Sequence, residues 1–125
     1  MSLFSATAPA HNWRRFYFVA LLLTLLFRGW LGAALPFTGD EAYFYWWGRI
    51  PAGGFYDHPP MVGWWLAGLI AVSEAEWWLR LPAILQPALL SFMLLAFLRD
   101  DPHATRWGVA TLVLLAPASV LDVLI

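Results

Sequence analysis

The sequence predicts an all-α integral membrane protein with about three transmembrane helices and two interfacial helices between the first two. Of its 125 residues, 62% are hydrophobic and only 12% are charged, whereas a soluble domain carries about a quarter charged residues. Nine tryptophans suit a chain that meets both membrane–water interfaces. A net charge of −1 without any lysine excludes a nucleic-acid binder. The absence of cysteine excludes disulfides and thiolate chemistry.

The first predicted transmembrane helix covers residues 16–35, after an N-terminal segment of residues 1–15. This apolar run contains one charge, Arg28, and about 20 residues suffice to cross the hydrocarbon core. Arg14 and Arg15 precede the run, so a cleaved signal peptide is the alternative interpretation. The run is longer than the about 7–15 apolar residues of a signal peptide, which favours a retained helix.

Two further transmembrane helices are predicted at residues 77–98 and 107–125, joined by a loop at residues 99–106. Ser73 and Glu76 have the spacing of a capping box that would begin the second helix. Pro87 lies inside that helix and lacks a backbone N–H, so we expect a kink there. The third run reaches the last residue without a closing loop. We therefore expect this chain to be the N-terminal fragment of a longer protein.

Residues 36–76 form the loop between the first two spans. Its apolar stretch at residues 61–72 has twelve residues, which as a helix reach only about 18 Å and fall short of the membrane core. If this stretch does not span, the arginines at residues 14–15 and 99–106 lie on one side of the membrane. The positive-inside rule then places the N-terminus in the cytoplasm and the loop outside.

Two helix starts in this loop carry acidic residues. Thr38 and Glu41 have capping-box spacing and would begin a helix, and a pair of prolines before residue 61 would begin the next. Asp40 and Asp57 lie at or just before these two starts. In the first helix we expect the aromatic residues on one arc and Glu41 on the polar side. A purely structural role for these acids remains open, because an acid near a helix N-terminus interacts with the helix dipole and stabilises the helix by about 0.3–1 kcal/mol.

The chemistry of the residues alone leaves two classes of function. One is an enzyme that acts on a lipid-linked substrate and uses a carboxylate as general base. The other is a non-catalytic membrane interaction or transport subunit whose acids line a path. A transporter would place its acids near the bilayer midplane, whereas here they gather in one extramembrane loop, which favours the enzyme. Arg28 is costly inside a span, by at least about 2.5–3.5 kcal/mol, so we expect it to face the protein interior.

Three ordered motifs resemble a known family: residues 40–46 (Asp-Glu-Ala-Tyr-Phe-Tyr-Trp), residues 55–62 (Phe-Tyr-Asp-His-Pro-Pro-Met-Val) and residues 80–82 (Arg-Leu-Pro). They are similar to the start of bacterial membrane glycosyltransferases of the protein O-mannosyltransferase / aminoarabinose-transferase-like family, which has the GT-C fold. The resemblance implies inverting transfer of a sugar from a polyprenyl-phosphate donor to a hydroxyl acceptor on a lipid, glycan or protein. It also implies a multi-pass protein of the bacterial inner membrane, acting at its outer face.

The resemblance further implies roles for individual residues. Asp40 is the candidate catalytic base, and Glu41 is its neighbour in the same motif. Asp57 and His58 stand where the family has an acid–base pair near the carrier phosphate or a bound metal. No cofactor is required, although this pair permits a divalent cation. Tyr43 occupies a segment in which some relatives place a phosphate-binding arginine, and it joins Arg28 as a candidate contact to the carrier phosphate. We expect Asp40 and Asp57 to converge on one cavity.

Overall fold

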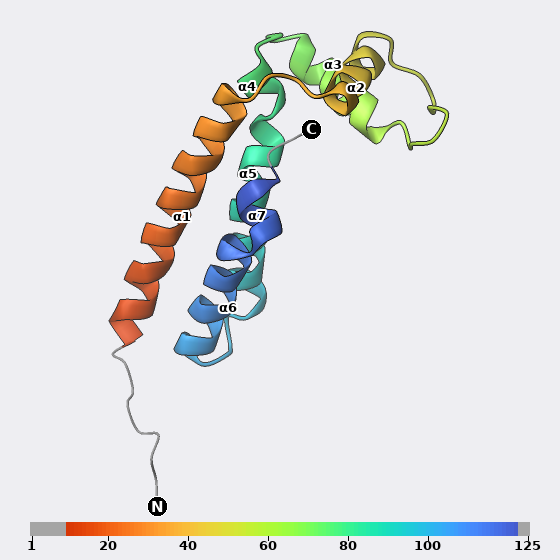
Figure 1. Cartoon of the computed structure of the whole chain (residues 1–125). Coiled ribbons are helices and arrows are strands. Elements are labelled where there is room, and N and C mark those ends of the chain that lie inside the picture. Colours follow the sequence, from red (N-terminus) through yellow and green to blue (C-terminus); the bar gives the residue numbers. More distant parts are fainter. Residues whose placement is uncertain (1–9, 123–125) are drawn as a thin grey trace, which may run out of the picture. The chain divides into compact units, whose positions relative to one another are not determined.

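The computed structural model describes residues 10–122, and within that range the chain forms helices and loops without any strand. This confirms the predicted all-α class. The elements in chain order are α1 (Ala10–Ala34), α2 (Gly39–Arg49), α3 (Met61–Ile70), α4 (Glu76–Leu79), α5 (Leu81–Phe97), α6 (His103–Leu115) and α7 (Pro117–Leu121) (Figure 1).

Within residues 10–122, two helical segments are long and apolar enough to cross a membrane. They are Asn12–Ala34, with 23 residues, and Glu76–Phe97, with 22 residues, which joins α4 and α5 through Arg80. The segments match the first two predicted spans, and α5 runs through Pro87 as one helix. The predicted capping box at Ser73 and Glu76 is wrong. Ala75 caps α4 without a side-chain hydrogen bond, and the Ser73 hydroxyl accepts a hydrogen bond from the backbone N–H of Ala75 at 3.2 Å instead.

The third apolar segment differs from the single helix that the sequence predicts. α6 ends at Leu115, and Ala116 is extended with φ −59° and ψ 139° before Pro117 begins α7. A residue that precedes proline is disfavoured in the helical region, because the proline ring clashes with its backbone. The expected helix at residues 107–125 is therefore divided at Ala116, and its last three residues lie outside the described range. That this segment crosses the membrane stays a prediction.

Contacts divide the chain into two compact units, which we describe separately. The first contains residues 10–27 and 85–122 of the described chain. Its buried core consists of Tyr17, Leu95, Ala110 and Leu114. The hydroxyl groups of Tyr17 and Ser91 lie 2.8 Å apart, and the Tyr17 ring packs edge-to-face on Trp107 with 5.2 Å between ring centroids. The buried phenol is therefore hydrogen-bonded, as a polar group in an apolar core must be.

The second unit, within residues 28–84, contains α2 to α4 and the ends of α1 and α5 that join them. α2 and α3 lie side by side (Figure 1), and glycine permits their close approach. A Cβ atom on Gly48 would lie 2.7 Å from the Cβ of Leu66. The indole N–H of Trp78 in α4 donates to the carbonyl of Leu69 in α3 at 2.9 Å. These contacts fix the loop helices to one another.

The orientation of α2 corrects the sequence-based expectation. Glu41 is 1% exposed and lies on the buried side with Trp47, whereas Trp46 and Ile50 are 60% and 68% exposed. The expectation placed Glu41 on the polar, outward side, and it was wrong because a buried cation pairs with this carboxylate. The exposed aromatic side is compatible with a membrane interface, and that location stays a prediction.

Candidate active site

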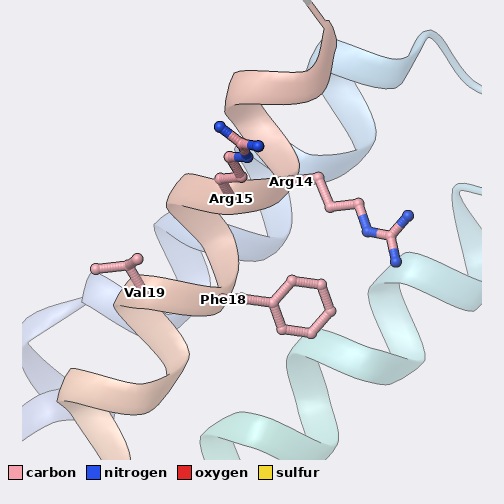
Figure 2. A pocket seen from close by; sticks show the side chains of 4 residues that line it. All are labelled: Arg14, Arg15, Phe18 and Val19. Atoms are coloured by element: carbon pink, nitrogen blue, oxygen red, sulfur yellow. The ribbon is translucent and has the colours of Figure 1, made fainter.

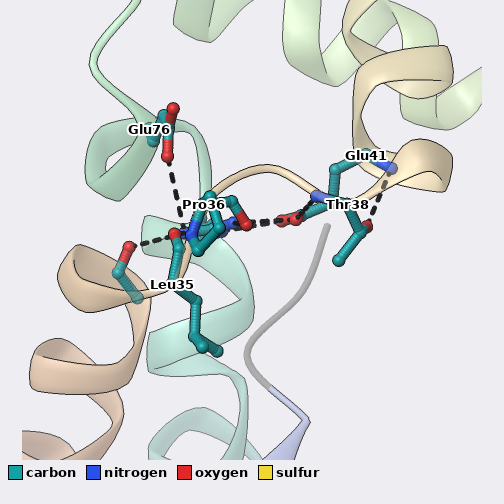
Figure 3. Close-up of polar contacts among 7 residues, drawn as sticks. Leu35, Pro36, Thr38, Glu41 and Glu76 are labelled. Carbon is teal, nitrogen blue, oxygen red and sulfur yellow. Dashed lines mark hydrogen bonds and ion pairs between the residues drawn. The ribbon is translucent and has the colours of Figure 1, made fainter.

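Arg80 is the centre of the polar contacts in the second unit. Its side chain is fully buried, and its guanidinium forms a two-pronged ion pair with Glu41. The Nε donates to Oε1 at 2.7 Å and an Nη donates to Oε2 at 2.7 Å. Figure 3 shows Leu35, Pro36 and Glu41 gathered around this position. Bidentate arginine–carboxylate pairs are the strongest and most directional of the ordinary hydrogen-bonded pairs.

The same guanidinium binds the carbonyl groups at the end of α1. It donates to the carbonyl oxygens of Gly32 at 2.8 Å, Leu35 at 2.6 Å and Pro36 at 3.0 Å. The last carbonyls of a helix have no intrahelical partner. Pro36 has no N–H, so it cannot donate to Gly32 four residues earlier. Arg80 therefore caps α1 and holds the start of the loop.

Glu41 makes a second set of contacts to the turn that begins α2. Its Oε2 accepts from the Thr38 N–H at 3.0 Å, and the Thr38 hydroxyl accepts from the Glu41 N–H at 3.3 Å. This confirms the predicted capping box. Both carboxylate oxygens of Glu41 are thus engaged by Arg80, and one also by Thr38. Sequence reasoning found the cap and placed Arg80 in the third motif, but it did not predict that Arg80 pairs with Glu41.

Asp40 precedes Glu41 in the first turn of α2 and faces solvent. The two adjacent acids therefore differ in environment, since one is buried in an ion pair and the other is exposed. Because successive residues of a helix point in different directions, fixing Glu41 also fixes the direction in which Asp40 points.

Asp57 and His58 form a pair of their own in the loop before α3. The Nδ1 of His58 lies 2.9 Å from Oδ1 of Asp57, and both side chains are about half exposed. The His58 ring packs against two aromatic rings of α2, with centroids 5.5 Å from Phe44 and 5.3 Å from Trp47. The loop thus holds its acid–base pair against the surface of α2.

Phe55 anchors this loop between the two helices. Its ring stacks on Trp47 with 4.3 Å between centroids and 9° between planes. On the α3 side, a Cβ atom on Gly63 would lie 2.6 Å from the Phe55 ring, so only glycine leaves room for it. The Phe55 N–H donates to the His58 carbonyl at 3.2 Å and closes the turn. We call Phe55, Trp47 and Gly63 the aromatic clamp.

The clamp places His58 against the surface of α2. Phe44 lies one helical turn after Asp40, so their side chains are neighbours on α2, and His58 contacts Phe44. Tyr43 is 49% exposed and packs on the Trp47 ring at 4.6 Å. This arrangement supports the expected convergence of Asp40 and Asp57, which stays a prediction.

A separate exposed contact ties α2 to the chain after α3. The Tyr45 hydroxyl donates to Glu74 at 3.1 Å, and Arg49 forms an ion pair with the same carboxylate. Desolvation, followed by the hydrogen bond to Glu74 and then the negative charge of Glu74, raises the pKa of Tyr45 above its ordinary value of 10.0. The phenol therefore stays protonated at neutral pH and remains a hydrogen-bond donor.

Arg28 is fully buried, as the sequence predicts for a charge inside a span. Its Nε donates to the carbonyl of Ile84 at 3.1 Å, and an Nη donates to the carbonyl of Ala83. Pro87 lacks the N–H that would otherwise bind Ala83 four residues earlier. Arg28 therefore donates a hydrogen bond to the Ala83 carbonyl of α5, which Pro87 leaves without its usual backbone donor. Its contact to a carrier phosphate stays a prediction.

The described residues contain no cluster of three or more metal-ligating side chains. Asp57 and His58 together supply two ligands. A cation at this pair would need further ligands from water, substrate or other residues.

Comparison with known proteins identifies one informative relative. The chain is 32% identical to the lipid A galacturonosyltransferase RgtD of Rhizobium johnstonii over 104 residues, which cover 76% of this chain. The aligned region is 22% of the relative, so the chain spans about a fifth of that protein. No family model matches the chain, and no solved structure matches it. The chain is thus similar to part of a glycosyltransferase.

Proposed function

We propose that this chain forms part of the active site of an inverting glycosyltransferase that uses a polyprenyl-phosphate-linked sugar as donor. The observation that carries the proposal is the contrast between two adjacent acids: Glu41 is locked in a buried ion pair, and Asp40 is exposed beside it. The similarity to a lipid A galacturonosyltransferase supports the reaction class. We place the reaction at the outer face of the bacterial inner membrane, with the N-terminus in the cytoplasm.

In the proposed reaction, Asp40 accepts the proton of an acceptor hydroxyl as its oxygen attacks the anomeric carbon. A bond forms between that oxygen and the anomeric carbon, while the bond from this carbon to the phosphate oxygen breaks. The polyprenyl phosphate leaves with the bonding electrons as an anion, so no general acid is required. The configuration inverts because attack comes from the face opposite the leaving group. General-base catalysis of this kind contributes about 10²–10⁴-fold to the rate.

The remaining site residues have supporting roles in this proposal. Glu41 is a positioning residue, because Arg80 occupies both of its oxygens and holds Asp40 in place. Asp57 and His58 bind the phosphate end of the donor, directly or through a divalent cation, and Tyr43 offers a hydroxyl beside them. Arg28 would contact a phosphate oxygen through its guanidinium, which also donates to two carbonyls of the chain at residues 83 and 84. The name of the relative makes galacturonic acid the first donor sugar and lipid A the first acceptor to test.

Substitution of Asp40 by asparagine in the full-length transferase tests the proposal, because we expect the part of the enzyme that this chain represents to be inactive alone. We expect Asp40→Asn to lower transfer of labelled galacturonic acid from its polyprenyl-phosphate carrier to lipid A by about 10²–10⁴-fold, with unchanged helix content. Asp101→Asn is the matched control, because Asp101 is also exposed but lies in the loop before α6. Normal turnover in Asp40→Asn would contradict the assignment of the base. No transfer by the wild-type protein to any hydroxyl acceptor would favour a non-catalytic membrane subunit.

A further inference from the structure

A hollow beside the N-terminal half of α1 has no role in the proposed reaction. Its volume is about 420 Å³, and it is lined by Arg14, Arg15, Phe18 and Val19. Figure 2 shows these four side chains along neighbouring turns of α1, with Arg14 and Phe18 pointing the same way. The hollow therefore combines two positive charges with an apolar wall.

The positive charge around this hollow comes from two helices. The guanidinium carbon of Arg14 lies 5.9 Å from the centroid of the Phe18 ring, and that of Arg106 in α6 lies 5.7 Å from the Trp107 ring. The two rings are themselves neighbours, with centroids 5.9 Å apart. Cation–π contacts of this kind hold each guanidinium in place beside an aromatic face.

These charges lack anionic partners within the described residues. Arg14 and Arg15 are exposed and form no ion pair there. The Nε of Arg106 is buried and donates to no acceptor in the described chain. The acids at this end of the unit are Asp100, which pairs with Arg99 at 3.4 Å, and its neighbour Asp101. An anion with several oxygen acceptors would complement the three remaining arginines.

The surface next to the hollow is apolar and follows one face of α1. Val19, Leu22, Leu23 and Leu26 are 55%, 58%, 60% and 62% exposed, and their spacing puts them on one side of the helix. A free phosphate would leave this stripe uncovered. A molecule with an anionic head and apolar chains would cover both the arginines and the stripe.

We propose that this end of α1 is a binding site for an anionic phospholipid. Its phosphate binds Arg14 and Arg15 in the hollow, and its acyl chains lie along the stripe from Val19 to Leu26. Basic residues at the end of transmembrane helices are a known setting for anionic headgroups. This site is separate from the proposed transferase reaction, and its test does not depend on that reaction.

Lipid binding to the purified protein tests the site. The protein in detergent is titrated with phosphatidylglycerol or phosphatidylcholine, and the bound lipids are counted by native mass spectrometry. We expect a preference for phosphatidylglycerol that falls about thirtyfold in the double variant Arg14→Gln, Arg15→Gln, or about fivefold for each arginine. The double variant with lysine at both positions should keep most of the preference. Arg99→Gln is the matched control for the single variant Arg14→Gln, since each removes one positive charge at the same end of the unit and Arg99 does not line the hollow.

Three results would overturn the proposal. A loss in Arg99→Gln equal to that in the single variant Arg14→Gln would show that net charge alone attracts the lipid. Competition by inorganic phosphate or glycerol phosphate as strong as that by phosphatidylglycerol would show that the stripe is unused. Equal binding of the two phospholipids by the wild-type protein would show that no anionic site exists.

Discussion

Replacement of Arg80 by methionine removes the contact on which the loop depends. The substitution takes away five hydrogen bonds: two to Glu41 and three to carbonyl groups at the end of α1. It leaves the Glu41 carboxylate 1% exposed and without its cation. Breaking a buried ion pair by removing one partner costs about 3–5 kcal/mol. We expect Arg80→Met to lower the free energy of unfolding by that amount.

The double variant Arg80→Met, Glu41→Met separates the ion pair from the carbonyl contacts. It removes both charges of the pair and leaves neither partner buried alone, so it should be less destabilising than the sum of the two single variants. The remaining cost comes from the unsatisfied carbonyl groups, at about 1–3 kcal/mol for each group that water cannot reach. The coupling energy of the cycle therefore measures the pair alone.

Reversible unfolding in mixed detergent, followed by tryptophan fluorescence, supplies these free energies. Arg49→Met is the matched control, because Arg49 pairs with Glu74 in the same loop but both side chains are about half exposed. An exposed pair contributes about 0.2–1 kcal/mol. A cost of Arg80→Met no larger than that of the control, or strict additivity in the double variant, would refute the reasoning.

Two more substitutions test the packing and the proline contact. Gly63→Ala should displace the Phe55 ring and cost about 1–3 kcal/mol of unfolding free energy, whereas Gly68→Ala in the same helix meets open space and should be neutral or slightly stabilising. Equal effects of the two would contradict the clamp. Pro87→Ala restores an N–H for the carbonyl that Arg28 binds. Arg28→Met should therefore lower the unfolding free energy by at least about 0.5 kcal/mol less in the Pro87→Ala background than in the wild type. An equal loss in the two backgrounds would show that the proline does not control this contact.

Much of the fold follows from local sequence signals. Length and apolar composition predicted two long apolar helices, because a helix that crosses the hydrocarbon core must be long and uninterrupted; that they cross a membrane stays a prediction. The capping box at Thr38 also appeared as predicted, since it depends only on residues within one turn. The division of the third segment follows from Pro117, a local signal that hydrophobicity alone does not reveal.

The same local sequence signals could not predict the burial of Glu41. Its position on the apolar side of α2 depends on Arg80, which lies 39 residues away in the sequence. A hydrophobic pattern assigns a carboxylate to the exposed side by default, and only a long-range partner reverses that assignment. The candidate acids at positions 40 and 57 were found by motif, while the clamp that holds the second of them depends on contacts between separate helices.

The burial of Arg80 and that of Arg28 have the same physical explanation, and this explanation limits which groups can bind the carrier phosphate. Pro36 and Pro87 each leave one helix carbonyl without its usual N–H, and in a membrane such a carbonyl must find a donor within the protein. Arg80 and Arg28 supply those donors. All five N–H donors of Arg80 are engaged, by Glu41 and by the carbonyls at the end of α1, so a carrier phosphate would have to displace one of these partners to reach Arg80. The exposed carboxylate of Asp40 meets no such competition. The proposed base is thus accessible without the loss of an existing contact, while positive charge for the leaving phosphate has to come from groups other than Arg80 or from a cation at the loop.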